Sequence, residues 1–136
     1  MTATPDLPRG TVLVEEEGGP LAQRVRAGPH VLAAGEPEAK GGDDSGPTPH
    51  ELLLAALGAC TSMTLRLYAK HKGLPLERVT VRLRHEKVEA VDRIEREITL
   101  VGDLTPDQRE RMRQIAERCP VHRTLVGEKR IDTTVA

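Results

Sequence analysis

The chain has 136 residues, with 20 Lys and Arg against 21 Asp and Glu, one aromatic residue and a formal net charge of −1. This length suits one compact domain rather than two, so we predict a single domain over residues 1–136 with one functional site. A nearly neutral chain without aromatic side chains to stack on bases argues against nucleic-acid binding.

The termini and the cysteine content bear on the compartment. The first residues lack a basic segment followed by an apolar run, and no stretch of about 18 uncharged apolar residues occurs. We therefore expect a soluble, cytoplasmic protein that does not insert into a membrane. The two cysteines, Cys60 and Cys119, lie too far apart for the dense disulfide framework of a small secreted domain. In a reducing compartment such a pair indicates redox chemistry, metal binding or two small buried side chains.

The first third of the chain has the pattern of short strands. Residues 1–9 are expected to form a disordered or extended tail. Residues 11–15, 21–25 and 30–33 are separated by Gly and Pro and predict an antiparallel meander of three strands. Residues 35–49 are rich in Gly, Pro and acidic side chains, have little to bury, and predict an exposed loop.

A long helix is expected to begin at Thr48, because Thr48-Pro-His-Glu51 has capping-box spacing with proline at the first helical position. It can continue to about Lys72, since Gly73 favours the left-handed conformation that ends helices. Residues 52–60 are apolar or small on every side. We therefore expect this helix to be covered on both faces, as two central helices packed inside sheets would be.

The remainder predicts a hairpin, a second helix and a closing strand. Polar and apolar residues alternate in 77–90 and 92–102, as expected for a long half-exposed hairpin. A second helix is expected from the capping box at Thr105 to Cys119, before Pro120 ends it. Residues 129–135 predict the last strand. The order βββ-α-ββ-α-β defines an α+β fold.

Cys60 lies on an apolar stripe of the first helix. At about 100° per residue it shares this stripe with Leu53, Leu57, Met63 and Leu67. The simplest interpretation is a small buried side chain, and burial would raise the pKa of its thiol. To act as a nucleophile, Cys60 would need a cation supplied by another part of the protein.

Cys119 stands in the segment Cys119-Pro-Val-His-Arg123, where a thiol is followed by a proline, an imidazole and a guanidinium. If the two helices pack together, a sulfenic acid at Cys60 could be resolved by Cys119 as a disulfide. A second core thiol is an equally open interpretation.

A metal site is the third interpretation. Cys119 and His122 have C-x-x-H spacing, and Cys60, His30 or His50 could complete four ligands. Zinc sites usually contain two paired clusters of ligands, and Cys60 has no partner close to it in the sequence. We therefore expect neither a metal nor a cofactor.

Two segments carry a family resemblance. The segment "GPTPHELLLAALGACTSMTLRLYA", followed much later by "IAERCPVHRTL", resembles the OsmC/Ohr family of osmotically inducible and organic hydroperoxide resistance proteins. The resemblance extends over roughly residues 10–136 and is strongest in the two helices. It implies an intertwined homodimer whose two long central helices are enclosed by antiparallel sheets from both chains.

The resemblance also implies an activity. It places Cys60 at the position of the peroxidatic cysteine and Cys119 at that of the resolving cysteine of a thiol-dependent peroxidase in oxidative-stress defence. The implied substrates are alkyl or fatty-acid hydroperoxides, and the implied reductant is a dithiol, in some members a dihydrolipoyl protein. The alternative is a non-enzymatic or slow dimer of the same fold that senses redox state or binds a small molecule.

The supporting residues depart from the family pattern. Family members commonly carry a Glu ten residues before the peroxidatic cysteine, where this chain has His50. Nine and ten residues differ by about 100° on a helix, so Glu51 is not interchangeable with that carboxylate and is as readily explained by the capping box. An aromatic residue commonly follows the peroxidatic cysteine, and Thr61 stands there instead.

The activating cation is also open. Arg24 and Arg26 alternate along one predicted strand, point to the same face, and are both candidates, while Arg123 is a third through its nearness to Cys119. For each, a solvated surface charge is the simpler interpretation. His122 could orient or deprotonate Cys119, or could contribute only a hydrogen bond at a helix end.

Overall fold

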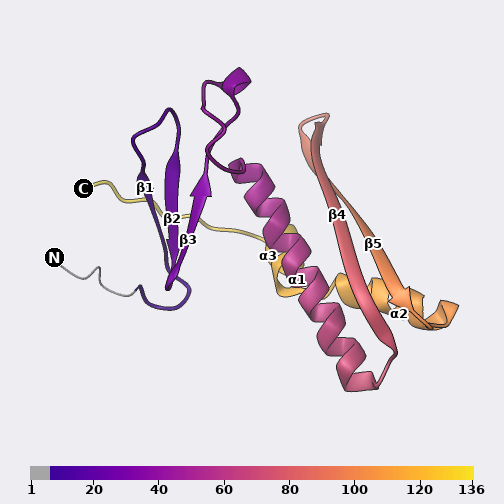
Figure 1. Ribbon diagram of the computed structural model, residues 1–136. Helices are drawn as coiled ribbons and strands as arrows, with labels where there is room; N and C mark the ends of the chain where they lie inside the picture. The colour runs from indigo at the N-terminus through magenta and orange to yellow at the C-terminus, as the bar shows by residue number, and fades with distance from the viewer. Residues whose placement is uncertain (1–6) are drawn as a thin grey trace. The chain divides into compact units, whose positions relative to one another are not determined.

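The computed structural model describes residues 7–136, so most of the tail expected over residues 1–9 lies outside the described residues. The chain forms two compact units, one from the described residues up to Leu53 and one from Leu54–Ala136. The long helix α1 (Pro49–Lys72) begins in the first unit and continues in the second (Figure 1). The fold class is α+β, as predicted, and a single domain over residues 1–136 stays a prediction.

The first unit contains the predicted meander. Its strands β1 (Val12–Glu16), β2 (Gln23–Ala27) and β3 (His30–Ala34) pair antiparallel in the order β1-β2-β3. Gly28, in the tight turn between β2 and β3, has a φ of 57°, which glycine adopts without steric cost. The loop that follows is largely exposed, as expected, and contains a 3₁₀ turn, η1 (Glu38–Lys40).

Helix α1 begins and ends where the sequence predicts. The backbone N–H of Thr48 donates to Oε1 of Glu51 at 2.9 Å, and the backbone N–H of Glu51 donates to Oγ1 of Thr48 at 3.1 Å. This capping box satisfies two backbone donors that a helix start leaves without partners. At the other end Gly73 has a φ of 66° and closes the helix after Lys72.

The described residues bury one face of α1. Residues spaced by four along the helix are buried, whereas apolar residues on another face are exposed. The cover that we expected on both faces is therefore not supplied by the described residues of one chain. The buried residues are Leu57, Gly58, Thr61, Leu65 and Ala69, and the exposed ones include Leu53, Met63 and Leu67.

Helix α1 is also long and apolar enough to cross a membrane, by length and composition alone, with 28% of its apolar window buried. The core helix of a soluble protein passes the same test. This property therefore does not distinguish a membrane span from a helix packed inside protein.

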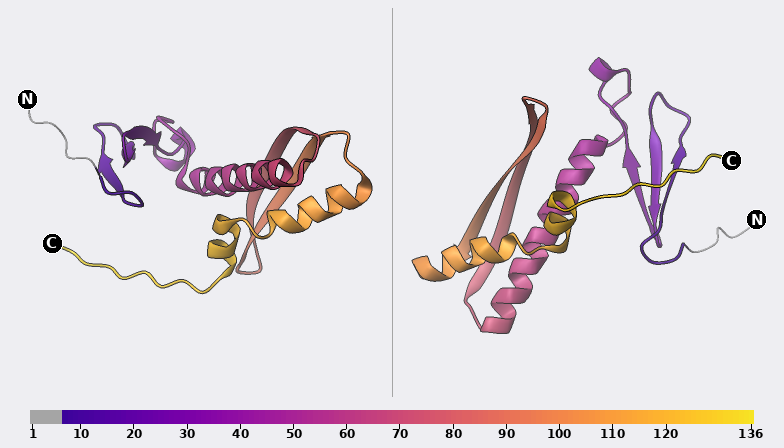
Figure 2. Two further views of the ribbon diagram at one scale, coloured as in Figure 1. Left: turned by 90° about the horizontal axis from the view of Figure 1, so that it is seen from below. Right: turned by 180° about the vertical axis from the view of Figure 1, so that it is seen from behind.

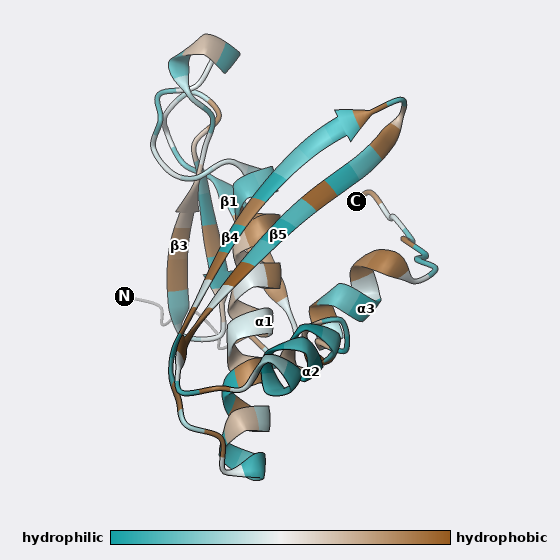
Figure 3. Ribbon diagram, turned by 90° about the vertical axis from the view of Figure 1, so that its right-hand side faces the viewer, coloured by the Kyte–Doolittle hydropathy of each residue, from teal (hydrophilic) through white to brown (hydrophobic). Residues whose placement is uncertain are grey.

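The second unit packs α1 with the predicted hairpin and with helical segments. The hairpin consists of β4 (Leu76–Val88) and β5 (Val91–Gly102), and it is followed by α2 (Pro106–Ala116) and α3 (Pro120–Val126). In both views of Figure 2, α2 lies beside α1 and the hairpin. Hydrophobic and hydrophilic bands alternate along β4 and β5 in Figure 3, as the sequence pattern indicates. The core cluster joins these elements through Leu65, Ala69, Leu76, Leu104, Met112, Ile115 and Ala116.

The second helix is shorter than predicted. Its capping box at Thr105 is confirmed, but α2 ends at Ala116, with Glu117 as its C-cap, instead of reaching Cys119. Cys119 has extended backbone angles, φ −58° and ψ 135°, because the ring of Pro120 disfavours a helical conformation in the residue before it. Proline then opens a further helix, α3, which was not predicted from the sequence.

The segment predicted as the last strand does not form one. Residues 129–135 have no regular secondary structure, and Ile131 and Val135 are 88% and 92% exposed. A strand is stabilised by ladder hydrogen bonds to a neighbour, and no strand of the described residues pairs with this segment. The prediction was wrong for the single chain because alternation in sequence does not supply a pairing partner.

Candidate active site

The site is built in the second unit, around the middle of α1. Cys60 is partly buried there, between the buried face of the helix and the exposed apolar face. Its neighbour Thr61 is fully buried and donates a hydrogen bond from Oγ1 to the carbonyl of Leu57 at 2.7 Å. The thiol thus stands at the edge of the packed interior, within reach of solvent.

Cys119 is placed beside α1 by the break between α2 and α3. It is fully buried and forms the N-cap of α3, where its Sγ accepts a hydrogen bond from the backbone N–H of His122 at 3.4 Å. The proline at the first position of α3 forces the turn that directs the thiol back toward the start of that helix.

The two thiols are hydrogen-bonded to each other, and their surroundings shift their pKa values in opposite directions. Burial acts to raise the pKa of Cys60, but hydrogen bonds from the side chain of Cys119, the backbone of Val121 and the side chain of Thr64 bring that pKa below its ordinary value. Burial, followed by the hydrogen bond to Cys60, raises the pKa of Cys119, against the opposing backbone hydrogen bond from His122. Cys60 is therefore the more acidic of the two thiols, and Cys119 is the less acidic one.

Arg96 of β5 joins the segments on either side of the thiol pair. Its Nη1 donates to Oγ1 of Thr61 at 3.1 Å, and its Nη2 is 3.1 Å from Nδ1 of His122. A guanidinium has no acceptor atom, so Nδ1 of His122 must accept and its proton must reside on Nε2. Burial lowers the pKa of His122, and the positive charge of Arg96 lowers it further, while Glu117 acts in the opposite sense. The imidazole is therefore neutral near pH 7.

Arg96 was not among the candidates identified from the sequence. The sequence did contain an indication of its position. Arg96 stands between Ile94 and Ile98 on the less exposed face of β5, where the alternating pattern places apolar residues. A charged residue in an apolar register needs a buried partner, and here Thr61 and His122 supply it.

His50 and Glu51 lie in the first turn of α1. His50 is exposed, and the carboxylate of Glu51 is engaged in the capping box with Thr48. Ten helical residues rise about 15 Å, so neither side chain can bond to Cys60 of the same helix. Any contact of these residues with a peroxidatic thiol would require a second copy of the chain.

The arginine candidates of the meander carry acidic partners. Arg24 and Arg26 share one face of β2, as the register requires. Arg24 lies 3.9 Å from a carboxylate oxygen of Glu17, and Arg26 lies 3.9 Å from one of Glu15. Only the side chain of Arg26, 14% exposed, is largely buried. Arg123 of α3 is exposed, so among the arginines of the second unit it is Arg96 that contacts both cysteine segments.

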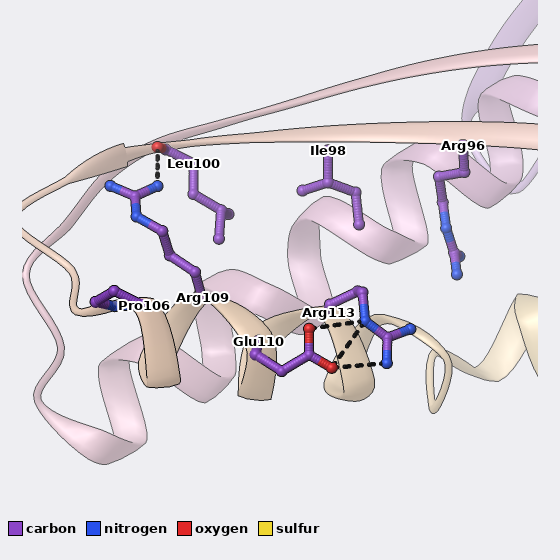
Figure 4. A pocket seen from close by; sticks show the side chains of 7 residues that line it. All are labelled: Arg96, Ile98, Leu100, Pro106, Arg109, Glu110 and Arg113. Atoms are coloured by element: carbon purple, nitrogen blue, oxygen red, sulfur yellow. Dashed lines mark hydrogen bonds and ion pairs between the residues drawn. The ribbon is translucent and has the colours of Figure 1, made fainter.

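Arg96 lines three cavities, two of which lie between β5 and the helices. The smaller of these two, of about 250 Å³, lies between α1, β5 and α3 and has a mostly aliphatic wall with Arg96, His122 and Asp92 at its polar side. The larger, of about 560 Å³, lies between β5 and α2. Figure 4 shows Arg96, Ile98 and Leu100 pointing from β5 toward α2. The aliphatic wall of the smaller cavity consists of Leu57, Ile94, Leu125 and Val126.

The described residues contain no cluster of ligands that would support the metal interpretation. In the part of the chain that the structure describes, no three side chains of His, Cys, Asp or Glu gather in a way that could hold an ion. Nδ1 of His122 faces Arg96, and the sulfur of Cys119 faces Cys60 and the backbone of α3. The C-x-x-H spacing is thus explained by the N-cap of α3.

The chain belongs to the OsmC-like protein family, whose pattern residues 42–134 match. These residues include both cysteines, Arg96 and His122. No curated protein resembles the chain closely enough to count as a match.

Solved structures share the fold. An OsmC-like protein from Mycoplasma pneumoniae has a TM-score of 0.70 at 19% identity, covering 86% of this chain and 85% of that one. The organic hydroperoxide resistance protein OsmC of Legionella pneumophila has a TM-score of 0.61 at 22% identity, with 86% and 90% covered. OhrB, an organic hydroperoxide resistance protein of Bacillus subtilis, has a TM-score of 0.60 at 20% identity, with 86% and 90% covered.

Proposed function

We propose that the protein is a thiol-dependent peroxidase that reduces organic hydroperoxides, with Cys60 as the peroxidatic and Cys119 as the resolving cysteine. The hydrogen bond between the two thiols carries this proposal, because it brings together sulfurs from distant parts of the chain. The peroxide-related names of the Legionella and Bacillus proteins of the same fold support it.

The roles of the two sulfurs follow from exposure and acidity. A peroxidatic cysteine must meet its substrate as a thiolate, and Cys60 is the more exposed sulfur with the lowered pKa. A resolving cysteine needs only to reach the oxidised sulfur. Cys119 is buried, protonated and hydrogen-bonded to Cys60.

The reaction has three balanced steps. The Cys60 thiolate attacks the outer oxygen of the hydroperoxide, the O–O bond breaks, and the alkoxide takes a proton to leave as an alcohol, so that Cys60–SOH forms. The Cys119 sulfur, losing its proton, attacks the sulfenic sulfur and displaces water to form the disulfide. An external dithiol then reduces this disulfide and is itself oxidised to a disulfide.

A cavity next to His122 supports an organic substrate. The cavity beside His122 has an aliphatic wall built from Leu57, Ile94 and Leu125, which suits an alkyl or fatty-acid chain better than hydrogen peroxide. We further propose a dithiol reductant, such as a dihydrolipoyl protein, and a role in oxidative-stress defence within the cytoplasm.

A homodimer is part of the proposal. The apolar residues Leu53, Met63 and Leu67 are exposed on α1, and a second copy of α1 with its sheets would bury them. A second copy would also be the source of any contact between Cys60 and His50 or Glu51, which lie several turns away on the same helix. We propose these two residues, with Arg24 and Arg26 of the meander, as candidates for supporting roles.

The test uses the reduced protein and one equivalent of cumene hydroperoxide. We expect the loss of two thiols and a Cys60–Cys119 disulfide in the mass spectrum of a digest. Cys119→Ser should still consume one equivalent and stop at a sulfenic acid that dimedone traps. If Cys60→Ser consumes the peroxide as fast as the parent protein, the proposal is wrong.

A second candidate function is a slow redox sensor of the same fold. It is favoured by one observation: among the described residues, those that shift the pKa of Cys60 are Cys119, Val121 and Thr64, none of which is a cation. A sensor would form the same disulfide without sustained turnover. Steady-state consumption of cumene hydroperoxide with dihydrolipoamide as reductant distinguishes the two, since only the peroxidase continues beyond one equivalent.

A further inference from the structure

Arg96 bonds to one residue in each of the two cysteine segments. Thr61 directly follows Cys60 in α1, and His122 supplies the backbone N–H that donates to the sulfur of Cys119. The guanidinium comes from β5, a third structural element that contains neither cysteine. One rigid planar group therefore holds both segments with two hydrogen bonds of 3.1 Å each.

We propose that Arg96 is a positioning residue that sets the distance between the two thiols by clamping Thr61 of α1 to His122 of α3. It acts through these two residues and touches neither sulfur. Any effect of Arg96 on catalysis rests on the proposed function. The distance between the two thiols can nevertheless be tested without a peroxide.

The clamp matters because α3 is weakly held otherwise. It has seven residues, none of them fully buried, and a helix of two turns is not stable by its own backbone bonds. A disulfide forms only when the two sulfurs approach to about 2 Å with a restricted dihedral angle. Small rotations of α3 would thus change the chance that Cys119 meets Cys60.

Burial makes the clamp specific to arginine. Thr61 is fully buried and His122 is partly buried, so each hydrogen bond from the guanidinium is formed away from bulk water. Lysine, with a single ammonium group, cannot span both acceptors with the fixed fork of a guanidinium. Arg96→Lys is therefore expected to keep the charge and lose the clamp.

The test measures how readily the two thiols form their own disulfide. The full-length protein is equilibrated with glutathione disulfide. As the Cys60–Cys119 bond forms, glutathione disulfide is reduced to two glutathione thiols, which take up the two protons released by Cys60 and Cys119. The equilibrium constant is the effective concentration of one cysteine at the other. We expect it to fall about tenfold in Arg96→Met and Arg96→Lys, as the loss of two charge-assisted hydrogen bonds implies.

Arg93→Met is the matched control, because Arg93 lies on the same strand, is 60% exposed and pairs with Glu86 and Glu95 at the surface. It should leave the effective concentration unchanged. An equal fall in Arg93→Met would show that charge or hairpin stability, rather than the clamp, is responsible, and would overturn the proposal. An unchanged constant in folded Arg96→Met would overturn it as well.

One measurement needs no variant and holds even if Arg96→Met fails to fold. Proton–nitrogen correlation spectra of the imidazole should show neutral His122 with its proton on Nε2 at pH 8. A proton on Nδ1 would remove the acceptor and overturn the clamp. If the clamp passes both tests while cumene hydroperoxide is not consumed, the positioning stands and the peroxidase proposal alone fails.

Discussion

The side chain of Cys119 is hydrogen-bonded to that of Cys60, and this contact lowers the pKa of Cys60 while it raises that of Cys119. The two sulfurs come from distant segments, Cys60 from α1 and Cys119 from the N-cap of α3, and their pKa values shift in opposite directions. The arrangement favours a thiolate at the more exposed sulfur and a thiol at the buried one. Both the order of reaction in the proposed mechanism and several measurable properties follow from it.

The acidity of Cys60 should depend on Cys119. Replacing Cys119 with Ala removes a hydrogen bond that stabilises the Cys60 thiolate, so the pKa of Cys60 should rise. The midpoint of the alkylation rate of Cys60 by iodoacetamide should then move to higher pH, and the thiolate fraction at neutral pH should fall about tenfold if that midpoint rises by about one pH unit. Cys119→Ser, which keeps an O–H donor, should move the midpoint less. A midpoint that is unchanged in Cys119→Ala would contradict the influence of Cys119 on the pKa of Cys60.

The protein should lose stability in weak acid through His122. The pKa of His122 is lower in the folded protein than the ordinary histidine value of about 6.5, so the unfolded chain binds the proton more readily. Stability is therefore fully present above about pH 6.5 and falls as the pH drops toward the folded pKa, by at most about 1.4 kcal/mol per pH unit for one proton. Urea unfolding of His122→Gln should show a shallower decline over this range. An identical decline would assign the effect to other groups.

Two leucines of α1 should respond differently to truncation. Leu65 is fully buried in the core cluster, and Leu65→Ala should lower the free energy of unfolding by about 2–5 kcal/mol. Leu67 is 67% exposed in the single chain, and Leu67→Ala should cost well under about 1 kcal/mol in a monomer. Denaturant titration of both variants, at a protein concentration where they are monomeric, checks the difference.

The exposed face of α1 should mediate the proposed dimer. Met63 is 65% exposed, and Met63→Glu would place a charge in the apolar interface and should shift the protein to monomer in analytical ultracentrifugation. Lys72→Glu changes the charge at an exposed position of the same helix about half a turn away from Met63 and serves as the control. If Met63→Glu stays dimeric at micromolar concentration, a different surface joins the two copies.

Glu51 should act as a cap rather than as a catalytic carboxylate. Glutamine also completes a capping box, so Glu51→Gln should keep the stability of the parent protein. It should likewise keep the rate of peroxide consumption, because the carboxylate is bonded to Thr48 and lies several turns from Cys60 of the same helix. A rate loss of about tenfold or more with unchanged stability would instead assign Glu51 a role in the site, supplied by a second copy.

Features set by neighbours in sequence could be predicted from the sequence. The capping boxes at Thr48 and Thr105 depend on residues three apart, and both are present. The hairpin depends on alternation within each strand, and its two strands lie within two residues of their predicted bounds. The family resemblance, carried by the two cysteine segments, is borne out by the match over residues 42–134.

Features that need a distant partner could not be predicted. The alternating pattern of residues 129–135 predicted a strand. Among the described residues no strand pairs with this segment, which the pattern alone could not show. Arg96 looked like one charge among many on a hairpin, because its partners Thr61 and His122 come from other elements.

The sequence by itself determined where α1, α2 and the hairpin of this protein begin, since caps and periodicity act over a few residues. Only the tertiary structure decided that Cys60 and Cys119 share a hydrogen bond and that Arg96 joins their segments. The physical reason is that burial and pairing are properties of groups brought together by packing. Residue types alone do not specify which side chains will share an interior.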